Sequence, residues 1–153
     1  MEKNIRKNHE QKNPKNIRAI IECYEEIPCD PCEIACKYGA IIIGKPITNI
    51  PVLDMEKCTG CGLCIANCPG LAIFVVCENY TDTLGTVSLP FEILPLPKKG
   101  QRVKTLNRNG QYVCRGEVVK VIETKSFDRT PVVTIAIPRN KVDEVRGIEI
   151  PKR

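Results

Sequence analysis

The 153-residue sequence contains no tryptophan, few other aromatic residues and a single histidine. Aromatic side chains bury more area than most others, so an aromatic content of 5% predicts a small core built from aliphatic side chains. The one histidine, His9, lies among Asn, Lys and Gln residues that offer little to bury. We therefore do not expect a histidine that acts as a base or binds a metal.

Long apolar runs and glycine-rich phosphate loops are missing too. No stretch approaches the ~18 apolar residues of a membrane-spanning helix, and the charged N-terminus lacks the apolar centre of a secretory signal. We therefore expect a cytoplasmic protein with no membrane span. No G-x-G-x-x-G or G-x-x-x-x-G-K-[ST] pattern occurs, so the chain alone is not expected to bind NAD or FAD.

Cysteine, in contrast, is abundant, with ten residues in the chain. Residues 58–69 read C-T-G-C-G-L-C-I-A-N-C-P, and this C-x2-C-x2-C-x3-C-P spacing is typical of bacterial ferredoxins that bind iron–sulfur clusters. In two-cluster ferredoxins the fourth cysteine binds the neighbouring cluster, so a second cysteine set is required. An extracellular disulfide framework is the alternative, but the tight clustering and the missing secretion signal argue against it.

A second cysteine set lies 32 residues upstream in the same layout. The alignment pairs Cys29, Cys32 and Cys36 with Cys61, Cys64 and Cys68. Apolar segments also align on both sides of the cysteines without a gap, which indicates one duplicated unit. Each unit is predicted to contain a short strand, a cysteine loop, a short helix bearing the fourth cysteine and another short strand.

The two repeats differ at one position, because Glu26 stands opposite Cys58. The nearest upstream thiol is Cys23. Thiolate is the preferred ligand of these clusters, so we favour Cys23 as the residue that takes the role of Cys58 and completes the four ligands of the first cluster. The Glu26 carboxylate and an iron without a fourth protein ligand are the alternatives, and either would leave the site prone to lose one iron.

Exchange of the fourth cysteines between the repeats predicts two 4Fe–4S clusters. The first set is Cys23, Cys29, Cys32 and Cys68, and the second set is Cys58, Cys61, Cys64 and Cys36. Because each set draws on both repeats, cluster binding and folding of this segment are expected to be coupled. Cys77 and Cys114 lie outside the motifs and are expected to be buried core thiols.

The composition changes after residue 80, where β-branched residues and turn signals replace the cysteines. Strands are expected at residues 86–89, 91–94, 102–106, 112–122 and 130–137, with a hairpin turn at Asn109-Gly110. Gly116 is expected to be a bulge or bend, and residues 138–145 to form one or two helical turns. These short strands predict a small antiparallel β-barrel or sandwich. No catalytic constellation is found in this part.

The predicted fold class is therefore α+β, in three segments. Residues 1–15 form a flexible basic tail, residues 16–80 a two-cluster ferredoxin domain, and residues 81–153 a small β-barrel-like docking domain. Residues 19–76 carry three Lys or Arg against seven acids, whereas residues 77–153 carry fourteen against nine. No basic–aromatic interleaving accompanies this positive charge, so docking on an acidic partner is favoured over binding to nucleic acid.

Residues 17–77 resemble a bacterial-type ferredoxin with two 4Fe–4S clusters. Over nearly the whole chain after the tail, the pattern is similar to small ferredoxin-like subunits of multi-subunit FAD-dependent amino-acid and amine dehydrogenases, of the proline, hydroxyproline and sarcosine/glycine-oxidase types. This wider resemblance rests on residues 27–33, Cys36, residues 39–41, 58–64 and 68–76, and on residues 89–97, which read L-P-F-E-I-L-P-L-P.

The wider resemblance implies a subunit that is not catalytic alone and works in a hetero-oligomer. It would pass electrons between an FAD-dependent partner subunit and an external acceptor, such as a one-electron carrier. Two alternatives remain open. The chain is either a free-standing two-cluster ferredoxin or, less favoured, a nucleic-acid-binding module with structural clusters.

Overall fold

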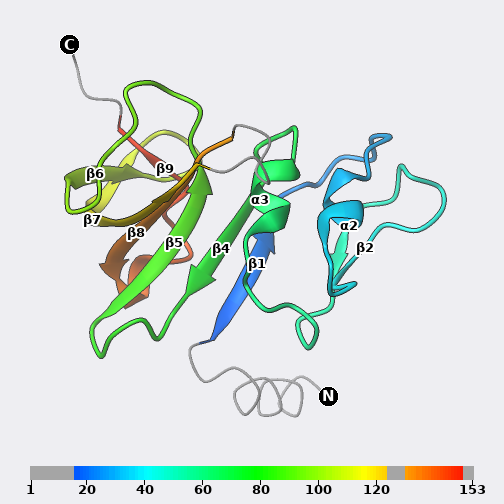
Figure 1. Cartoon of the computed structure of the whole chain (residues 1–153), viewed down its shortest axis with the longest axis horizontal. Helices are drawn as coiled ribbons and strands as arrows, with labels where there is room; N and C mark the ends of the chain where they lie inside the picture. Colours follow the sequence, from blue (N-terminus) through cyan, green and yellow to red (C-terminus); the bar gives the residue numbers. More distant parts are fainter. Residues whose placement is uncertain (1–15, 124–129, 150–153) are drawn as a thin grey trace.

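The computed structural model describes residues 16–123 and 130–149, so the predicted tail at residues 1–15, with His9, lies outside the described residues. Strands predominate, with only two short α-helices in the described part (Figure 1). The elements are β1 (Ile17–Ile21), α2 (Pro31–Ala35), β2 (Ile41–Ile42), β3 (Val52–Leu53), α3 (Leu63–Asn67), β4 (Ile73–Cys77), β5 (Leu84–Pro90), β6 (Arg102–Leu106), β7 (Tyr112–Ile122), β8 (Val132–Pro138), the 3-10 turn η2 (Arg139–Lys141) and β9 (Gly147–Ile148).

One antiparallel sheet of seven strands runs through most of the molecule, in the order β1-β4-β5-β8-β7-β6-β9. The outermost strands, β1 and β9, do not pair with each other, so this sheet is open and the predicted barrel does not close among the described strands. The reason is that β4, from the cysteine-bearing half, pairs with β5 and carries the sheet across residue 80. The division into two domains at that residue stays a prediction.

The 32-residue repeat is confirmed in the geometry, because α2 and α3 start and end 32 residues apart. The first strand of each repeat pairs with the last strand of the other: β1 with β4, and β2 with β3. The backbone amide of Glu22 donates to the carbonyl of Ala72 at 2.8 Å, and the equivalent amide of Asp54 donates to Ala40 at 2.7 Å. The repeats are therefore intertwined rather than placed side by side.

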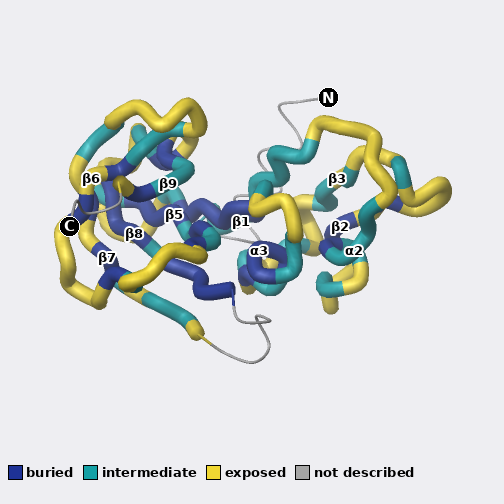
Figure 2. Tube along the Cα trace, turned by 90° about the horizontal axis from the view of Figure 1, so that it is seen from above, coloured by how far each residue is buried: buried dark blue, intermediate teal, exposed yellow. Residues whose placement is uncertain are grey.

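The buried residues are mainly aliphatic, as the low aromatic content predicts, and they form two groups. The larger group lies in the sheet around fully buried side chains such as Val118, Val133 and Ile135. The smaller group surrounds Ile65 and includes several cysteines. In Figure 2 the buried residues concentrate in the sheet and α3, whereas the loops around α2, β2 and β3 are mostly exposed. The cysteine half therefore has little apolar core of its own.

Two local expectations about the strands are wrong. The strand expected at residues 91–94 does not form, because β5 ends at Pro90 and the chain leaves the sheet after Phe91, whose amide still donates to the carbonyl of Pro131 at 3.0 Å. Gly116 sits in regular register opposite Val103 rather than in a bulge. A Cβ at Gly116 would lie 2.5 Å from Ile135 Cγ2, so the glycine permits close packing on β8.

The helices also differ from expectation in which cysteine they carry. Both end one residue before the fourth cysteine, and Cys36 and Cys68 occupy extended C-cap positions. Cys32 and Cys64, the third cysteine of each predicted motif, lie inside the helices instead. The extended C-cap turns each fourth cysteine away from its own helix. Within residues 16–123 and 130–149, no helix has the length and apolar character needed to cross a membrane.

Candidate metal centre

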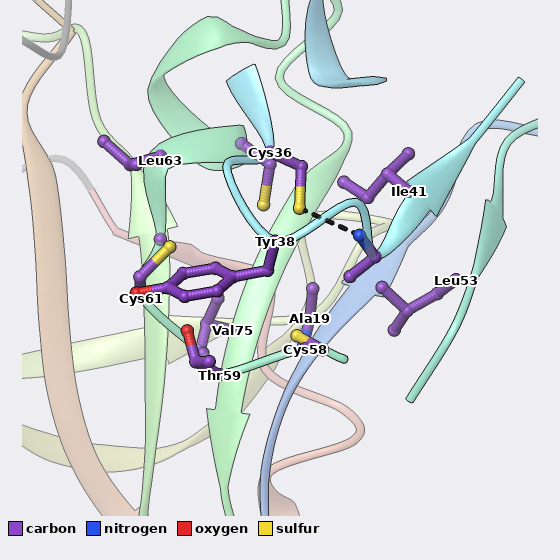
Figure 3. A pocket seen from close by; sticks show the side chains of 14 residues that line it. Ala19, Cys36, Tyr38, Ile41, Leu53, Cys58, Thr59, Cys61, Leu63 and Val75 are labelled. Atoms are coloured by element: carbon purple, nitrogen blue, oxygen red, sulfur yellow. Dashed lines mark hydrogen bonds between the residues drawn. The ribbon is translucent and has the colours of Figure 1, made fainter. Parts of the chain in front are cut away.

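The first of two cysteine-lined cavities lies between α3, β1 and the β2–β3 pair. Its four cysteines are Cys36, Cys58, Cys61 and Cys64, and it encloses about 340 Å³, part of it open to solvent. The remaining lining is largely apolar and includes Ile41, Leu53 and Val75. Figure 3 shows the thiols of Cys36, Cys58 and Cys61 around this cavity, with Tyr38 beside them. This set is the one predicted for the second cluster.

The second cavity is lined by residues of β1, α2, β4 and the loops between them, and it encloses about 380 Å³, including open space. Its cysteines are Cys23, Cys29, Cys32 and Cys68. The structure thus brings together both predicted sets, each completed by one cysteine from the other repeat. Among the described residues, Glu25 lines this cavity beside the cysteines and Glu26 does not.

The donor chemistry of both cavities fits a cluster better than a single ion. Four thiolates around one zinc ion, with Zn–S bonds of about 2.3 Å, stand roughly 3.8 Å apart. In the part of the chain that the structure describes, no three Cys, His, Asp or Glu side chains converge in that way. Four thiols spread around a cavity suit a larger, multi-iron group, which thiolates hold. The residues present therefore fit a 4Fe–4S cluster in each cavity.

Glycines shape the loop that carries Cys58, Cys61 and Cys64. Gly60 and Gly62 adopt φ values of 73° and 81°, which side chains rarely tolerate. A Cβ at Gly60 would also lie 1.9 Å from Ile17 Cγ2, because the loop packs directly on β1. The glycines thus let the cysteine loop wrap tightly while lying against the edge strand of the sheet.

Backbone amides point at three of the sulfur atoms. Ala40 N donates to Cys36 Sγ at 3.3 Å, and its repeat equivalent, Ala72 N, donates to Cys68 Sγ at 3.4 Å. Ala19 N donates to Cys58 Sγ at 3.4 Å. Such bonds stabilise thiolate and tune the reduction potential of a cluster. Sequence reasoning missed these donors, although the alignment of Ala40 with Ala72 was a usable signal for two of them.

The departure at Glu26 is matched by a second departure in the other repeat. In the repeat alignment, the counterpart of Cys58 is Glu26 and the counterpart of its donor, Ala19, is Pro51. Proline has no backbone N–H, so it cannot donate to a sulfur at that place. The residues that correspond to the donor and the acceptor of the Ala19–Cys58 hydrogen bond are therefore both replaced. Cys23, three residues before Glu26, lines the cavity instead.

Burial keeps several of these thiols protonated when no metal is bound. Loss of hydration, followed by the charges of neighbouring cysteines, raises the pKa of Cys32 to about 11 and of Cys64 to about 12. The same causes raise the pKa of Cys29. Metal binding requires thiolates, so binding at neutral pH must release these protons.

The two remaining cysteines do not line either cavity. Cys77 is buried in β4, as expected of a core thiol. Cys114 is only half-buried, in β7, with its sulfur 3.3 Å from the hydroxyl of the buried Thr105. Both therefore belong to the sheet rather than to the metal centre.

Comparison with known proteins agrees with this chemistry. Residues 51–74 match the family described as a 4Fe-4S binding domain. The chain is 43% identical over 61 residues to one subunit of the ion-translocating oxidoreductase complex of Methanosarcina acetivorans, covering 39% of this chain and 21% of that protein. It is 38% identical over 52 residues to the "Ferredoxin-type protein NapF" of Escherichia coli K12, covering 33% of this chain and 32% of that protein.

A longer and weaker similarity extends beyond the cysteine half. The chain is 26% identical over 136 residues to "Protein Pixie" of Drosophila melanogaster, covering 78% of this chain and 21% of that protein. The chain spans only about a fifth to a third of the length of these three relatives. No solved structure is a significant match.

The cysteine spacing, the thiol-lined cavities and the family match show that the chain contains a ferredoxin-type 4Fe–4S domain. Electron transport is the chemistry of this class, because a cluster bound by thiolates changes its charge by single electrons. The relative from Methanosarcina acetivorans is, by its name, part of an oxidoreductase complex.

Proposed function

We propose that the chain is an electron-transfer subunit that holds two 4Fe–4S clusters. One cluster is bound by Cys23, Cys29, Cys32 and Cys68, and the other by Cys58, Cys61, Cys64 and Cys36. The observation that carries this proposal is the pair of separate cavities, each lined by four cysteines of which one belongs to the other repeat. When bound, each cluster supplies a site that takes up and releases one electron.

Residues of this chain control how much water reaches each cluster and how well the negative charge on its sulfur ligands is stabilised. Apolar side chains such as Ile41 and Ile73 limit water at the two cavities. The amides of Ala19, Ala40 and Ala72 stabilise the negative charge on sulfur and so favour the reduced form. Crossed ligation places both sites in one intertwined unit, which supports electron exchange between them.

Cys23 rather than Glu26 is the proposed fourth ligand of the first cluster. Cys23 lines the cavity with the other three cysteines. Glu26 is exposed, and the amide donor expected for a ligand at that position is replaced by Pro51. These observations support the thiolate over the carboxylate.

The proposed partner is an FAD-dependent dehydrogenase that oxidises an amino acid or amine, within a cytoplasmic hetero-oligomer. The resemblance to the small subunits of such enzymes, carried by residues 27–33, 36, 39–41, 58–64, 68–76 and 89–97, motivates this partner. Residues 81–153 would form the docking domain. The exposed side chains of Tyr24, Ile27 and Tyr38 near the cavities support docking of a partner close to the clusters.

Affinity purification from the native cells, under anaerobic conditions, tests the proposal. We expect the chain to co-purify with a flavin-containing protein, and amine or amino-acid oxidation by that complex to reduce the clusters. A chain that purifies alone and exchanges electrons equally with unrelated reductases would instead be a free-standing ferredoxin. A stable, salt-sensitive complex with DNA or RNA would favour a nucleic-acid-binding module.

A further inference from the structure

Glu22, which directly precedes Cys23, binds two arginines from the far end of the chain. Its carboxylate accepts a hydrogen bond from Arg146 Nε at 2.8 Å and forms an ion pair with Arg108. On the other side of Cys23, the ring of Tyr24 lies under the Arg108 guanidinium, 5.3 Å from its centre. Both neighbours of Cys23 are therefore held by arginines that follow it by more than eighty residues.

Arg146 is itself firmly fixed. Its side chain is only 7% exposed, and its Nη1 donates to the carbonyls of Val142 at 3.0 Å and Val145 at 2.6 Å. Its guanidinium also lies 5.2 Å from the ring centre of Phe74 in β4. Val142 and Val145 belong to the buried core of the sheet. Arg146 therefore ties the position of Glu22 to that of the sheet core.

The second repeat holds its equivalent ligand by other means. There the counterpart of Glu22 is Asp54, whose carboxylate accepts a hydrogen bond from the nearby amide of Glu56 and forms an ion pair with Lys57. Cys58 receives its hydrogen bond from Ala19 N of the first repeat, whereas Pro51 of the second repeat stands where a donor to the first repeat's loop would be. The arginine contacts thus occur in the first repeat. In that repeat the proposed ligand, Cys23, lies three residues before the position equivalent to Cys58 and has no equivalent of the Ala19 amide donor.

We infer that Arg146 and Arg108 are positioning residues, which hold Cys23 at the first cluster through Glu22 and Tyr24. The inference rests on the proposed function, since it assumes that Cys23 is a cluster ligand. It gives the C-terminal half a second role beside docking: this half stabilises the metal-binding loop of the N-terminal half. Neighbours that orient a ligand typically change metal affinity about 10- to 100-fold when they are removed.

The test compares variants of the full chain after anaerobic reconstitution, by EPR and by iron retained against a chelator. The signals lost in Cys23→Ser and in Cys58→Ser identify the first and second cluster. We expect Arg146→Gln to reduce the chelator resistance of the first cluster about tenfold or more, and to leave the second cluster unchanged. Arg139→Gln, at an exposed arginine bound to Asn79 and Asp82 away from both cavities, should match the wild type.

Two further variants distinguish a positioning role of Arg146 from an effect of its positive charge and from a general folding defect. Arg146→Lys keeps the charge but not the planar fork of donors, so it should restore chelator resistance only in part. Arg108→Gln changes a half-exposed side chain at a turn, so it should fold even if Arg146→Gln does not, and it should weaken the same cluster. Wild-type retention in both glutamine variants, or equal loss from both clusters, overturns the inference.

The same experiment distinguishes a failure of this inference from a failure of the proposed function. If the wild type holds a single cluster, or Cys23→Ser leaves both signals intact, the proposed ligand sets are wrong. If Cys23→Ser removes one signal while Arg146→Gln and Arg108→Gln leave both, the ligand sets stand and only the positioning role is overturned.

Discussion

The backbone amide of Ala19, in the edge strand β1, donates a hydrogen bond to the sulfur of Cys58 at 3.4 Å. This contact joins the two repeats, because Ala19 precedes the first cysteine loop and Cys58 begins the second. In the repeat alignment the same two places hold Pro51 and Glu26, so the contact exists on one side only. The two cavities therefore differ in how the proposed ligands Cys58 and Cys23 are held, and this difference can be tested.

Replacement of Cys23 by serine should disturb one cluster and leave the other. Serine removes the thiolate that iron prefers, so the first site should lose one iron and show a three-iron signal in the oxidised protein. EPR of the oxidised and reduced forms measures this. The matched variant Glu26→Gln should leave both clusters as in the wild type. A loss of iron in Glu26→Gln with an unchanged Cys23→Ser spectrum would assign the ligand to the carboxylate.

Replacement of Gly60 by alanine should damage the second cluster more than replacement of Gly44 does. Both glycines have positive φ values, near 73° and 68°, so both variants bear a strain of about 1–2 kcal/mol. Only at Gly60 would the new Cβ collide with Ile17, which should add about 1–3 kcal/mol. Chemical unfolding and iron content measure the difference. Equal behaviour of the two variants would show that the loop is not held against β1.

Cluster assembly should become weaker as the pH falls. The pKa values of Cys32 and Cys64 lie above the ordinary thiol value of 9.0, at about 11 and about 12, so each thiol must lose a proton to bind iron. Apparent affinity should therefore rise with pH throughout the range from about 6 to about 9, where the free thiols stay protonated. Iron retained against a fixed chelator concentration gives the slope. A retention that does not change with pH would contradict this account of proton release.

Removal of iron should unfold the cysteine half before the sheet. The residues between β1 and β4 bury few apolar side chains apart from those near Ile65, whereas β5, β7 and β8 surround a core that contains Val118, Val133 and Ile135. Hydrogen exchange of the apo chain should show lost protection at α2 and α3 and retained protection in β5, β7 and β8. Uniform loss in all elements would mean that the clusters support the whole fold.

The grouping of the cysteines around the two cavities was more predictable than the sheet, for a physical reason. The spacing of Cys58, Cys61 and Cys64 is set by a local loop, and the 32-residue repeat extends the same rule to Cys29 and Cys32. The open sheet depends on the pairing of β4 with β5 across the composition change at residue 80, which no local pattern indicates. Local spacing therefore predicts which cysteines line the cavities, and long-range pairing decides the architecture.

Contacts that join distant segments were the least predictable part of the site. Glu22 and Arg146 are 124 residues apart in sequence, and neither belongs to a motif. Their meeting requires the turn after η2 to lie against β4, which follows only from the folded sheet. The donor Ala19 was missed for the same reason, since its sulfur partner lies 39 residues away in the other repeat.

The central claim is that two clusters are held by crossed sets of cysteines, and the iron and acid-labile sulfide content of the anaerobically purified chain tests it most directly. Two 4Fe–4S clusters require about eight irons and about eight sulfides per chain. The account predicts these values for the wild type. A content of about four irons, with an EPR spectrum that shows one isolated cluster, would contradict it.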